Sequence, residues 1–83
     1  MYTIFFTPTA EKSLFKLEKN MQVRIIATLD RIKFRPHAFV LRLAGSRYFR
    51  LRVGDYRIIL DIQQERLLII VIELGHRKNI YKG

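Results

Sequence analysis

Arginine dominates the stretch whose residue types are best suited to chemistry, "YFRLRVGDYRII" at residues 48–59. Arg50, Arg52 and Arg57 flank a Gly-Asp pair, which signals a two-residue hairpin loop because glycine tolerates positive φ. Arg47 lies just before them, and every basic residue of this region is arginine. A planar guanidinium matches phosphate better than the point charge of lysine does, so this stretch predicts a phosphate site.

The hairpin register separates these arginines from the core. A two-residue loop pairs Val53 with Tyr56 and therefore sets Arg52 directly opposite Arg57. Strand alternation divides the side chains between two faces. The predicted core face holds Phe49, Leu51, Val53, Tyr56, Ile58 and Leu60, and the other face holds Tyr48, Arg50, Arg52 and Arg57. Two like charges across a ladder cost up to about 1 kcal/mol, which is easier to understand if an anion binds between them.

The C-terminal stretch "GHRKNIY" adds four candidates, His76, Arg77, Lys78 and Tyr81. Histidine titrates near neutral pH and can transfer a proton, although an isolated histidine is also common as an ordinary surface residue. The sequence has no paired carboxylates, no Gly-rich phosphate loop and no His/Asp/Glu set with metal-ligand spacing. We therefore expect a phosphate site made of arginines, one histidine and tyrosines, with no metal and no cofactor.

Composition sets the broad class of the protein. Its 83 residues are enough for one small domain, 1–83, with a modest core. The net charge of +9 favours an anionic partner, namely nucleic acid, a membrane surface or an acidic protein; a merely solubilising surface is the alternative. The chain has no cysteine, no signal peptide pattern and no apolar run long enough to cross a bilayer. We expect a soluble, cytoplasmic protein.

Two helices are predicted after a short strand, "YTIFF" at 2–6. Thr7 is a suitable N-cap, and Pro8 fits the first helical position. Apolar residues then recur at helical spacing, with a break expected at Asn20 and a stop at Pro36. The predicted helical core positions are Ala10, Leu14, Leu17, Met21, Ile25, Ile26, Leu29 and Ile32.

The rest of the chain alternates as strands do. A weak candidate at 39–45 precedes three strong ones at 48–53, 56–62 and 66–74. The predicted fold is α+β: an N-terminal strand, then a two-helix hairpin packed on a twisted antiparallel sheet. The last strand is apolar on both faces, and the helices cover only one. A segment of the same chain or a partner chain must shield the other face.

The element order, "RLRVGDYRII" and the closing "GHRKNIY" together resemble the RelE/ParE superfamily of toxin–antitoxin toxins, and the RelE branch in particular. The resemblance covers essentially the whole chain. It implies a metal-independent endoribonuclease that cuts messenger RNA in the ribosome. In that reaction the ribose 2′-hydroxyl attacks the adjacent phosphate, giving a cyclic phosphate and a free 5′-hydroxyl.

The resemblance also assigns roles. Arg57 and Arg77 would stabilise charge on the scissile phosphate, and Tyr81 would stack on or orient the substrate. Arg50 and Arg52 fall on basic strand positions that bind backbone phosphate. The best-known relatives have lysines there, one of them a proton acceptor. Arginine stays protonated, so Arg52 is a poor general base. Either His76 or a ribosomal group accepts the proton, or charge stabilisation alone suffices.

Two alternatives remain open beside the RelE-like nuclease. A ParE-like toxin inhibits DNA gyrase on the same fold, and a non-catalytic nucleic-acid-binding module would bind without cleavage. The resemblance implies a cognate antitoxin in a toxin–antitoxin hetero-oligomer, with an acidic amphipathic segment that hides the arginines. Such a partner would also explain the doubly apolar last strand. We expect messenger RNA and the ribosome as the other partners, and no membrane.

Overall fold

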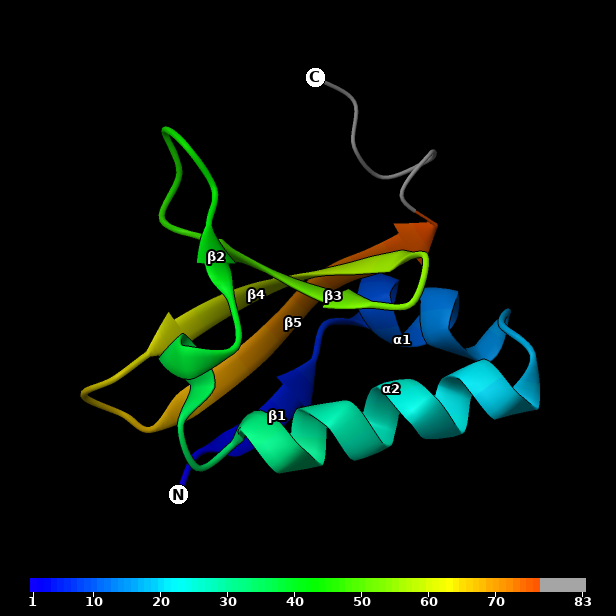
Figure 1. Ribbon diagram of the computed structural model, residues 1–83, viewed down its shortest axis with the longest axis horizontal. Helices are drawn as coiled ribbons and strands as arrows, with labels where there is room; N and C mark the ends of the chain where they lie inside the picture. The colour runs from blue at the N-terminus through cyan, green and yellow to red at the C-terminus, as the bar shows by residue number, and fades with distance from the viewer. Residues whose placement is uncertain (77–83) are drawn as a thin grey trace.

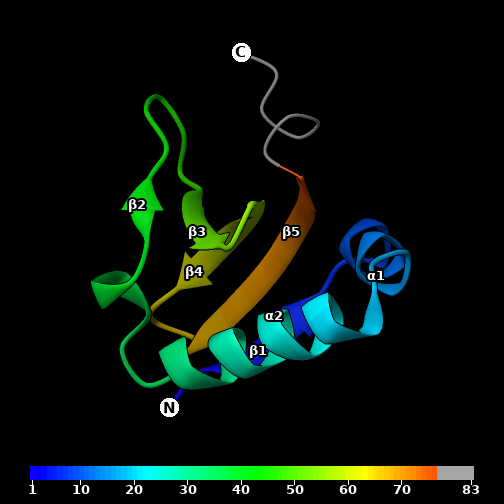
Figure 2. The ribbon, with the colours of Figure 1, turned by 45° about the vertical axis from the view of Figure 1, so that its right-hand side comes forward.

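The computed structural model describes residues 1–76 of the chain. Its elements follow one another as β1 (Thr3–Phe6), α1 (Pro8–Phe15), α2 (Lys19–Ile32), a short 3-10 helix (Pro36–Ala38), β2 (Leu41–Arg42), β3 (Phe49–Val53), β4 (Tyr56–Gln63) and β5 (Leu68–His76). The strands form one sheet, and both helices lie against the same face of it (Figures 1 and 2). The predicted α+β architecture is confirmed.

The sheet is mixed, not wholly antiparallel as expected. Its strand order is β1-β5-β4-β3-β2, with β1 parallel to β5 and every other pair antiparallel. The parallel pair follows from the connection, because the chain leaves β1 through both helices before it begins the meander. The last strand then returns beside the first and runs in the same direction. As a result β5 lies inside the sheet, between β1 and β4.

The start of α1 was predicted correctly, and the break between the helices was not. The Thr7 hydroxyl accepts a hydrogen bond from the amide of Ala10 (3.1 Å), and Pro8 begins the helix. The break lies at residues 16–18, and Asn20 is inside α2. Glu18 is the N-cap of α2, and its backbone carbonyl accepts hydrogen bonds from the amides of Met21 and Gln22. Asn20 is an exposed residue within the first turn of the helix. The helix ends at Ile32, four residues before Pro36.

The core lies between the helices and the inner face of the sheet. Its buried members are Ala10, Leu14, Ile25, Leu29, Ile32, Leu51, Val53, Ile58, Leu60, Ile69, Val71 and Leu74. Leu17 and Met21 are partly buried against them. The prediction that Ile26 widens this core is wrong, since Ile26 is 45% exposed. It lies on the side of α2 that points toward β1, where the sheet edge leaves space.

The hairpin register is the predicted one. Val53 pairs with Tyr56, Arg52 with Arg57 and Arg50 with Ile59. Gly54 has φ of +59°, and Asp55 does not have positive φ. Positive φ at the first loop position alone is the pattern of a type II′ turn, which matches the twist of the flanking strands. The weak strand predicted at 39–45 shrinks to Leu41–Arg42, and the residues that follow form a loop that projects beyond the sheet (Figure 1).

The two apolar faces of β5 have different surroundings. On the inner face Ile69 and Val71 are fully buried. On the outer face Leu68 and Ile70 are only half-buried, and their neighbour Phe5 on β1 is 52% exposed. The sheet neighbours thus shield the outer face in part. The turn before β5 extends to Leu67, which has φ of +52°, so the strand begins two residues later than predicted.

Candidate nucleic-acid interface

Three arginines gather on the outer face of the β3–β4 hairpin. We call Arg50, Arg52 and Arg57 the arginine face. Arg52 and Arg57 are directly opposed across the ladder, so their Cα atoms are about 4.5 to 5.5 Å apart. Arg50 is two residues from Arg52 on the same strand and therefore on the same side. Neither helix covers this side of the sheet, so the three arginines belong to the face that the helices leave open.

The members of the arginine face differ in burial. Arg52 is exposed, whereas Arg50 and Arg57 are half-buried, and Nη1 of Arg57 is shielded from solvent. The neighbour across from Arg50 is Ile59, which is nearly buried and provides an apolar floor. A guanidinium held against an apolar floor is less screened by water than one in the open, so its attraction for phosphate is stronger. The shielded Nη1 of Arg57 and the apolar neighbour of Arg50 both reduce this screening.

Arg47 was predicted to bind phosphate, and the structure gives it an internal partner. Its Nη2 lies 3.3 Å from both carboxylate oxygens of Asp61, whose side chain is only 10% exposed. Gln63 also donates to this carboxylate (3.0 Å). The pair ties the 43–48 loop to β4 and offsets one positive charge. The sequence contains no local signal for this pair, because Asp61 lies fourteen residues away on β4.

His76 lies on the other side of the sheet from the arginine face. It pairs with Tyr56, and their rings meet edge to face with centroids 5.6 Å apart. Tyr56 in turn pairs with Val53, a core residue. Side chains directly opposed on a ladder share a face, so His76 points to the helix side while Arg52 and Arg57 point away from it. Arg77, Lys78 and Tyr81, the remaining predicted site residues, lie outside the described residues.

Two basic residues that the sequence reasoning did not select lie beside the hairpin turn. Arg24 and Arg31 project from α2 and, with Arg52, line a hollow of about 430 Å³. We call it the basic hollow; its lining is Arg24, Ala27, Thr28, Arg31, Arg52, Val53 and Gly54. The i, i+4, i+7 spacing of Arg24, Thr28 and Arg31 was available as a signal, because it places them on one side of a helix.

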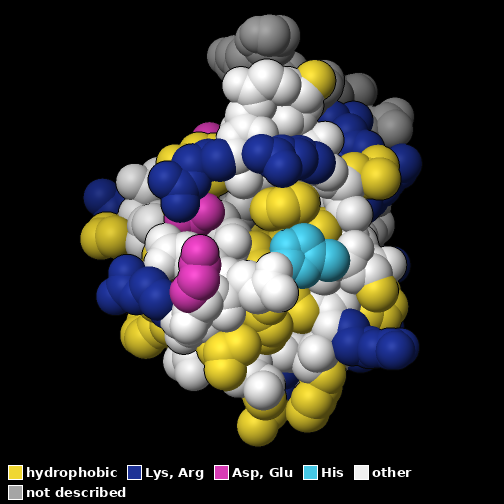
Figure 3. Space-filling view, turned by 90° about the vertical axis from the view of Figure 1, so that its left-hand side faces the viewer, with side chains coloured by type: hydrophobic (Ala, Val, Ile, Leu, Met, Phe, Trp, Pro, Cys, Tyr) yellow, Lys and Arg dark blue, Asp and Glu magenta, His cyan; other side chains and the backbone are white. Residues whose placement is uncertain are grey.

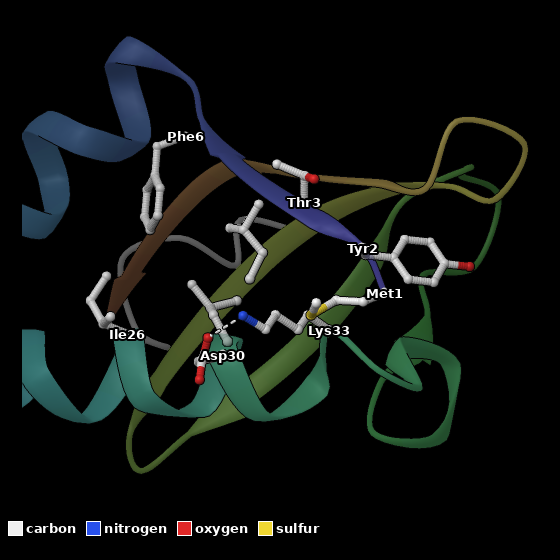
Figure 4. A pocket seen from close by; sticks show the side chains of 9 residues that line it. Met1, Tyr2, Thr3, Phe6, Ile26, Asp30 and Lys33 are labelled. Atoms are coloured by element: carbon white, nitrogen blue, oxygen red, sulfur yellow. Dashed lines mark ion pairs between the residues drawn. The ribbon is translucent and has the colours of Figure 1, made fainter.

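A second hollow of the same volume, about 430 Å³, lies between α2 and β1 (Figure 4). We call it the apolar hollow; its lining is Met1, Tyr2, Thr3, Ile4, Phe6, Ile26, Leu29, Asp30 and Lys33. Its two charged groups neutralise each other, since Asp30 Oδ1 lies 2.7 Å from Lys33 Nζ. The basic hollow has no such pair, so the two sides of α2 differ in charge.

Figure 3 views the end of the molecule opposite the β3–β4 turn, so the basic hollow lies outside this view. On the side that faces left in Figure 1, the Lys and Arg side chains lie mostly across the upper part and the apolar side chains gather lower down (Figure 3). Over residues 1–76 no group of three His, Cys, Asp or Glu side chains is arranged to hold a metal ion. In the same part of the chain no helix is long and apolar enough to cross a membrane. Among the described residues the clustered arginines have side chains suited to bind an anion.

Comparison with known proteins identifies relatives along the whole chain. The family model for the ParE toxin of the type II toxin–antitoxin system matches residues 4–81. Toxin RelG of Mycobacterium tuberculosis is 31% identical over 86 residues, which is 98% of this chain and 97% of that protein. Among solved structures, the RelBE2 toxin–antitoxin complex of Mycobacterium tuberculosis matches with a TM-score of 0.81 and 26% identity, covering 92% of this chain and 98% of the matched chain.

An archaeal structure is equally similar. The RelE–RelB complex from Pyrococcus horikoshii matches with a TM-score of 0.80 and 26% identity over 94% of this chain and 97% of the matched chain. The first of these structures is a toxin–antitoxin complex, and the second is a complex of RelE with RelB. The family model, the sequence relative and the two solved structures agree, so together they assign the chain to one protein family.

Proposed function

Because this chain belongs to the RelE/ParE family of type II toxin–antitoxin toxins, we propose that it is a ribosome-dependent endoribonuclease that cuts messenger RNA. The observation that carries the proposal is the directly opposed pair Arg52 and Arg57, with Arg50 beside it, on the face that the helices leave open. Three guanidinium groups within a few residues suit a substrate that presents consecutive phosphates.

In the proposed reaction the ribose 2′-oxygen attacks the neighbouring phosphorus, and the bond to the 5′-oxygen of the next nucleotide breaks. The products are a 2′,3′-cyclic phosphate and a free 5′-hydroxyl. Negative charge builds on the phosphoryl oxygens in the transition state, where Arg57 is placed to stabilise it. Arg77 is proposed to assist, and Tyr81 to stack on or orient a base. Arg50 and Arg52 hold the flanking backbone, with lesser roles for Arg47 and Lys78.

The proton of the attacking hydroxyl needs an acceptor. Arg52 stays protonated and cannot take it. The placement of His76 against Tyr56, on the helix side, argues against His76 as the acceptor and as a phosphate ligand. We therefore propose that a group of the ribosome takes the proton while the arginines stabilise charge. The proposal therefore predicts cleavage on the ribosome and none of free RNA.

The proposed partner is a cognate antitoxin with an acidic amphipathic segment. Its carboxylates would neutralise the arginine face. Its apolar side chains would cover the half-buried Leu68 and Ile70 and the exposed Phe5 on the same side of the sheet. A reading frame for a small acidic protein beside the gene, whose co-expression restores growth, would support this partner.

The decisive experiment is induced expression followed by mapping of messenger RNA ends. Wild-type protein should arrest translation and create new 5′-hydroxyl ends at codons in the ribosome. Arg57→Gln should lower the cleavage rate about 10²- to 10³-fold, the size expected for removing one transition-state charge donor. Arg66→Gln removes the same charge in the exposed turn before β5 and should leave cleavage intact. Intact translation and messenger RNA after induction would refute the proposal.

A second candidate is inhibition of DNA gyrase. The family model that matches the chain is named for the ParE toxin, which favours this alternative, whereas the sequence relative and the structural matches carry RelE-type names. The arginine face decides our preference, because a gyrase inhibitor has no need of a charge donor opposite a second arginine. Induced DNA breaks with continuing translation would establish the gyrase reading instead.

A further inference from the structure

We propose that the basic hollow is a second phosphate-binding site, which grips the RNA backbone at the edge of β3 and is separate from the position of cleavage. It is formed by Arg24 and Arg31 of α2 together with Arg52. The proposal rests on RNA being the substrate, as proposed above, and it extends the contact surface from the sheet onto a helix.

The hollow has the size and the charge of an anion site. Its volume of about 430 Å³ is ample for a phosphate with part of its sugar, and three of its seven lining residues are arginines. None of the three makes an ion pair with a carboxylate within residues 1–76. Three positive charges facing one cavity repel one another, so a bound anion relieves a cost that the folded protein otherwise carries.

The hairpin turn fixes the position of the hollow. Arg52 Nε lies 3.5 Å from the carbonyl oxygen of Gly54, so the Arg52 side chain lies against the turn. The Arg24 guanidinium lies over Gly54 so closely that a β-carbon there would be 3.1 Å from Nη1. The absence of a side chain at residue 54 thus lets the α2 arginine reach the turn. The Thr28 hydroxyl donates to the Arg24 carbonyl (2.8 Å), which leaves recognition to the arginines.

Arg52 connects the hollow with the arginine face. It lines the hollow, and across the ladder it is opposed to Arg57. Beyond β2, which is only two residues long, the far half of β3 is the edge of the sheet. The positive surface therefore passes from the outer face, around this edge and onto α2, with Asp55 of the turn beside it. A continuous basic path of this kind follows a nucleic-acid backbone and reads no bases.

The test uses an RNA that cannot be cut. A labelled 2′-O-methyl RNA lacks the attacking hydroxyl, so its affinity reports binding alone. Arg24→Gln/Arg31→Gln should weaken binding by at least about tenfold at moderate salt. It should also lower the slope of log affinity against log salt by about 1.4, which is two single-strand phosphate contacts. The loss should be the same for RNAs of different sequence.

Arg35→Gln/Arg66→Gln is the matched control. It removes the same two charges from exposed positions outside the hollow. Because all four side chains are exposed, both double variants should unfold at the wild-type temperature. If the two double variants bind RNA with equal affinity and equal salt slope, the proposal is wrong. It is also wrong if the α2 variant loses affinity only for an acidic antitoxin.

Ribosome binding identifies the source of the phosphate. Loss of affinity for ribosomes with and without messenger RNA assigns the hollow to ribosomal RNA, whereas loss only on programmed ribosomes assigns it to the message. Either result supports a phosphate site. The cleavage assay and the binding assays test different proposals. If the wild-type protein failed to cut messenger RNA, the proposed function would be wrong, but the binding of the double variants could still be compared.

Discussion

The two sides of α2 enclose hollows of equal volume and opposite character. Toward the hairpin turn the helix presents Arg24 and Arg31, and the basic hollow has no acidic side chain in its lining. Toward β1 it presents Ile26 and Asp30, and the apolar hollow holds its one ion pair. One helix thus separates charge from apolar surface. The comparison shows that the net charge of +9 is unevenly distributed over the surface. The position of the charges therefore says more about where an anion would bind than their sum does.

The largest effect is expected from a substitution that weakens the packing of α2 on the sheet, the feature that both hollows share. Leu29 is 1% exposed, so Leu29→Ala leaves a cavity under the helix. We expect a loss of about 2 to 5 kcal/mol in the free energy of unfolding, measured by urea denaturation. Val23→Ala on the exposed surface of α2 is the control, with a change within about 0.5 kcal/mol. Equal losses would mean that α2 does not depend on this contact.

Two glycines allow the effect of backbone strain to be distinguished from the effect of displacing Arg24. Gly45 and Gly54 both have positive φ, but a β-carbon meets nothing within 4 Å at Gly45 and meets Arg24 at Gly54. Gly45→Ala and Gly54→Ala should each cost about 1 kcal/mol of unfolding free energy, because alanine is strained at positive φ. Only Gly54→Ala should also weaken RNA binding, since it displaces Arg24. Equal RNA affinity for both variants would contradict the role given to Arg24.

The smallest effect is expected on RNA affinity, when one of two aspartates is replaced by asparagine. Asp55 lies in the turn beside Gly54, and Asp30 lies in the apolar hollow, paired with Lys33. Asp55→Asn should raise RNA affinity about two- to fivefold. It removes a carboxylate near the arginines that repels the RNA phosphates by at most about 1 kcal/mol. Asp30→Asn makes the same change in net charge on the other side of the helix and should alter affinity less than about twofold. Equal gains would show that only net charge matters.

The sequence was sufficient for the parts of the molecule that depend on local patterns. Alternation and one Gly-Asp pair predicted the register of the β3–β4 hairpin residue by residue, and Thr7 and Pro8 marked the start of α1. The helix break was misplaced because an apolar spacing that continues through Leu17 and Met21 does not distinguish one helix from two. A cap made by a backbone carbonyl, as at Glu18, leaves no side-chain signal.

The candidate site could be predicted only where its members are close in sequence. Arg50, Arg52 and Arg57 lie within one hairpin, so periodicity brought them together. The basic hollow joins α2 to a turn some thirty residues later, and the Arg47–Asp61 pair crosses from a loop to a strand. Such contacts depend on tertiary packing. His76 was placed with the arginines by sequence, and the ladder puts it on the opposite face.

The position of β5 inside the sheet has a consequence for synthesis of the protein. Residues 68–76 supply the partner of both β1 and β4, and they bring Ile69 and Val71 into the core. Contacts between β1 and β5 join residues about sixty-five apart, so the topology has high contact order and folds late. A nascent chain that stops before β5 lacks the strand that joins β1 to β4. The sheet of this toxin therefore stays unfinished during synthesis until β5 has left the ribosome.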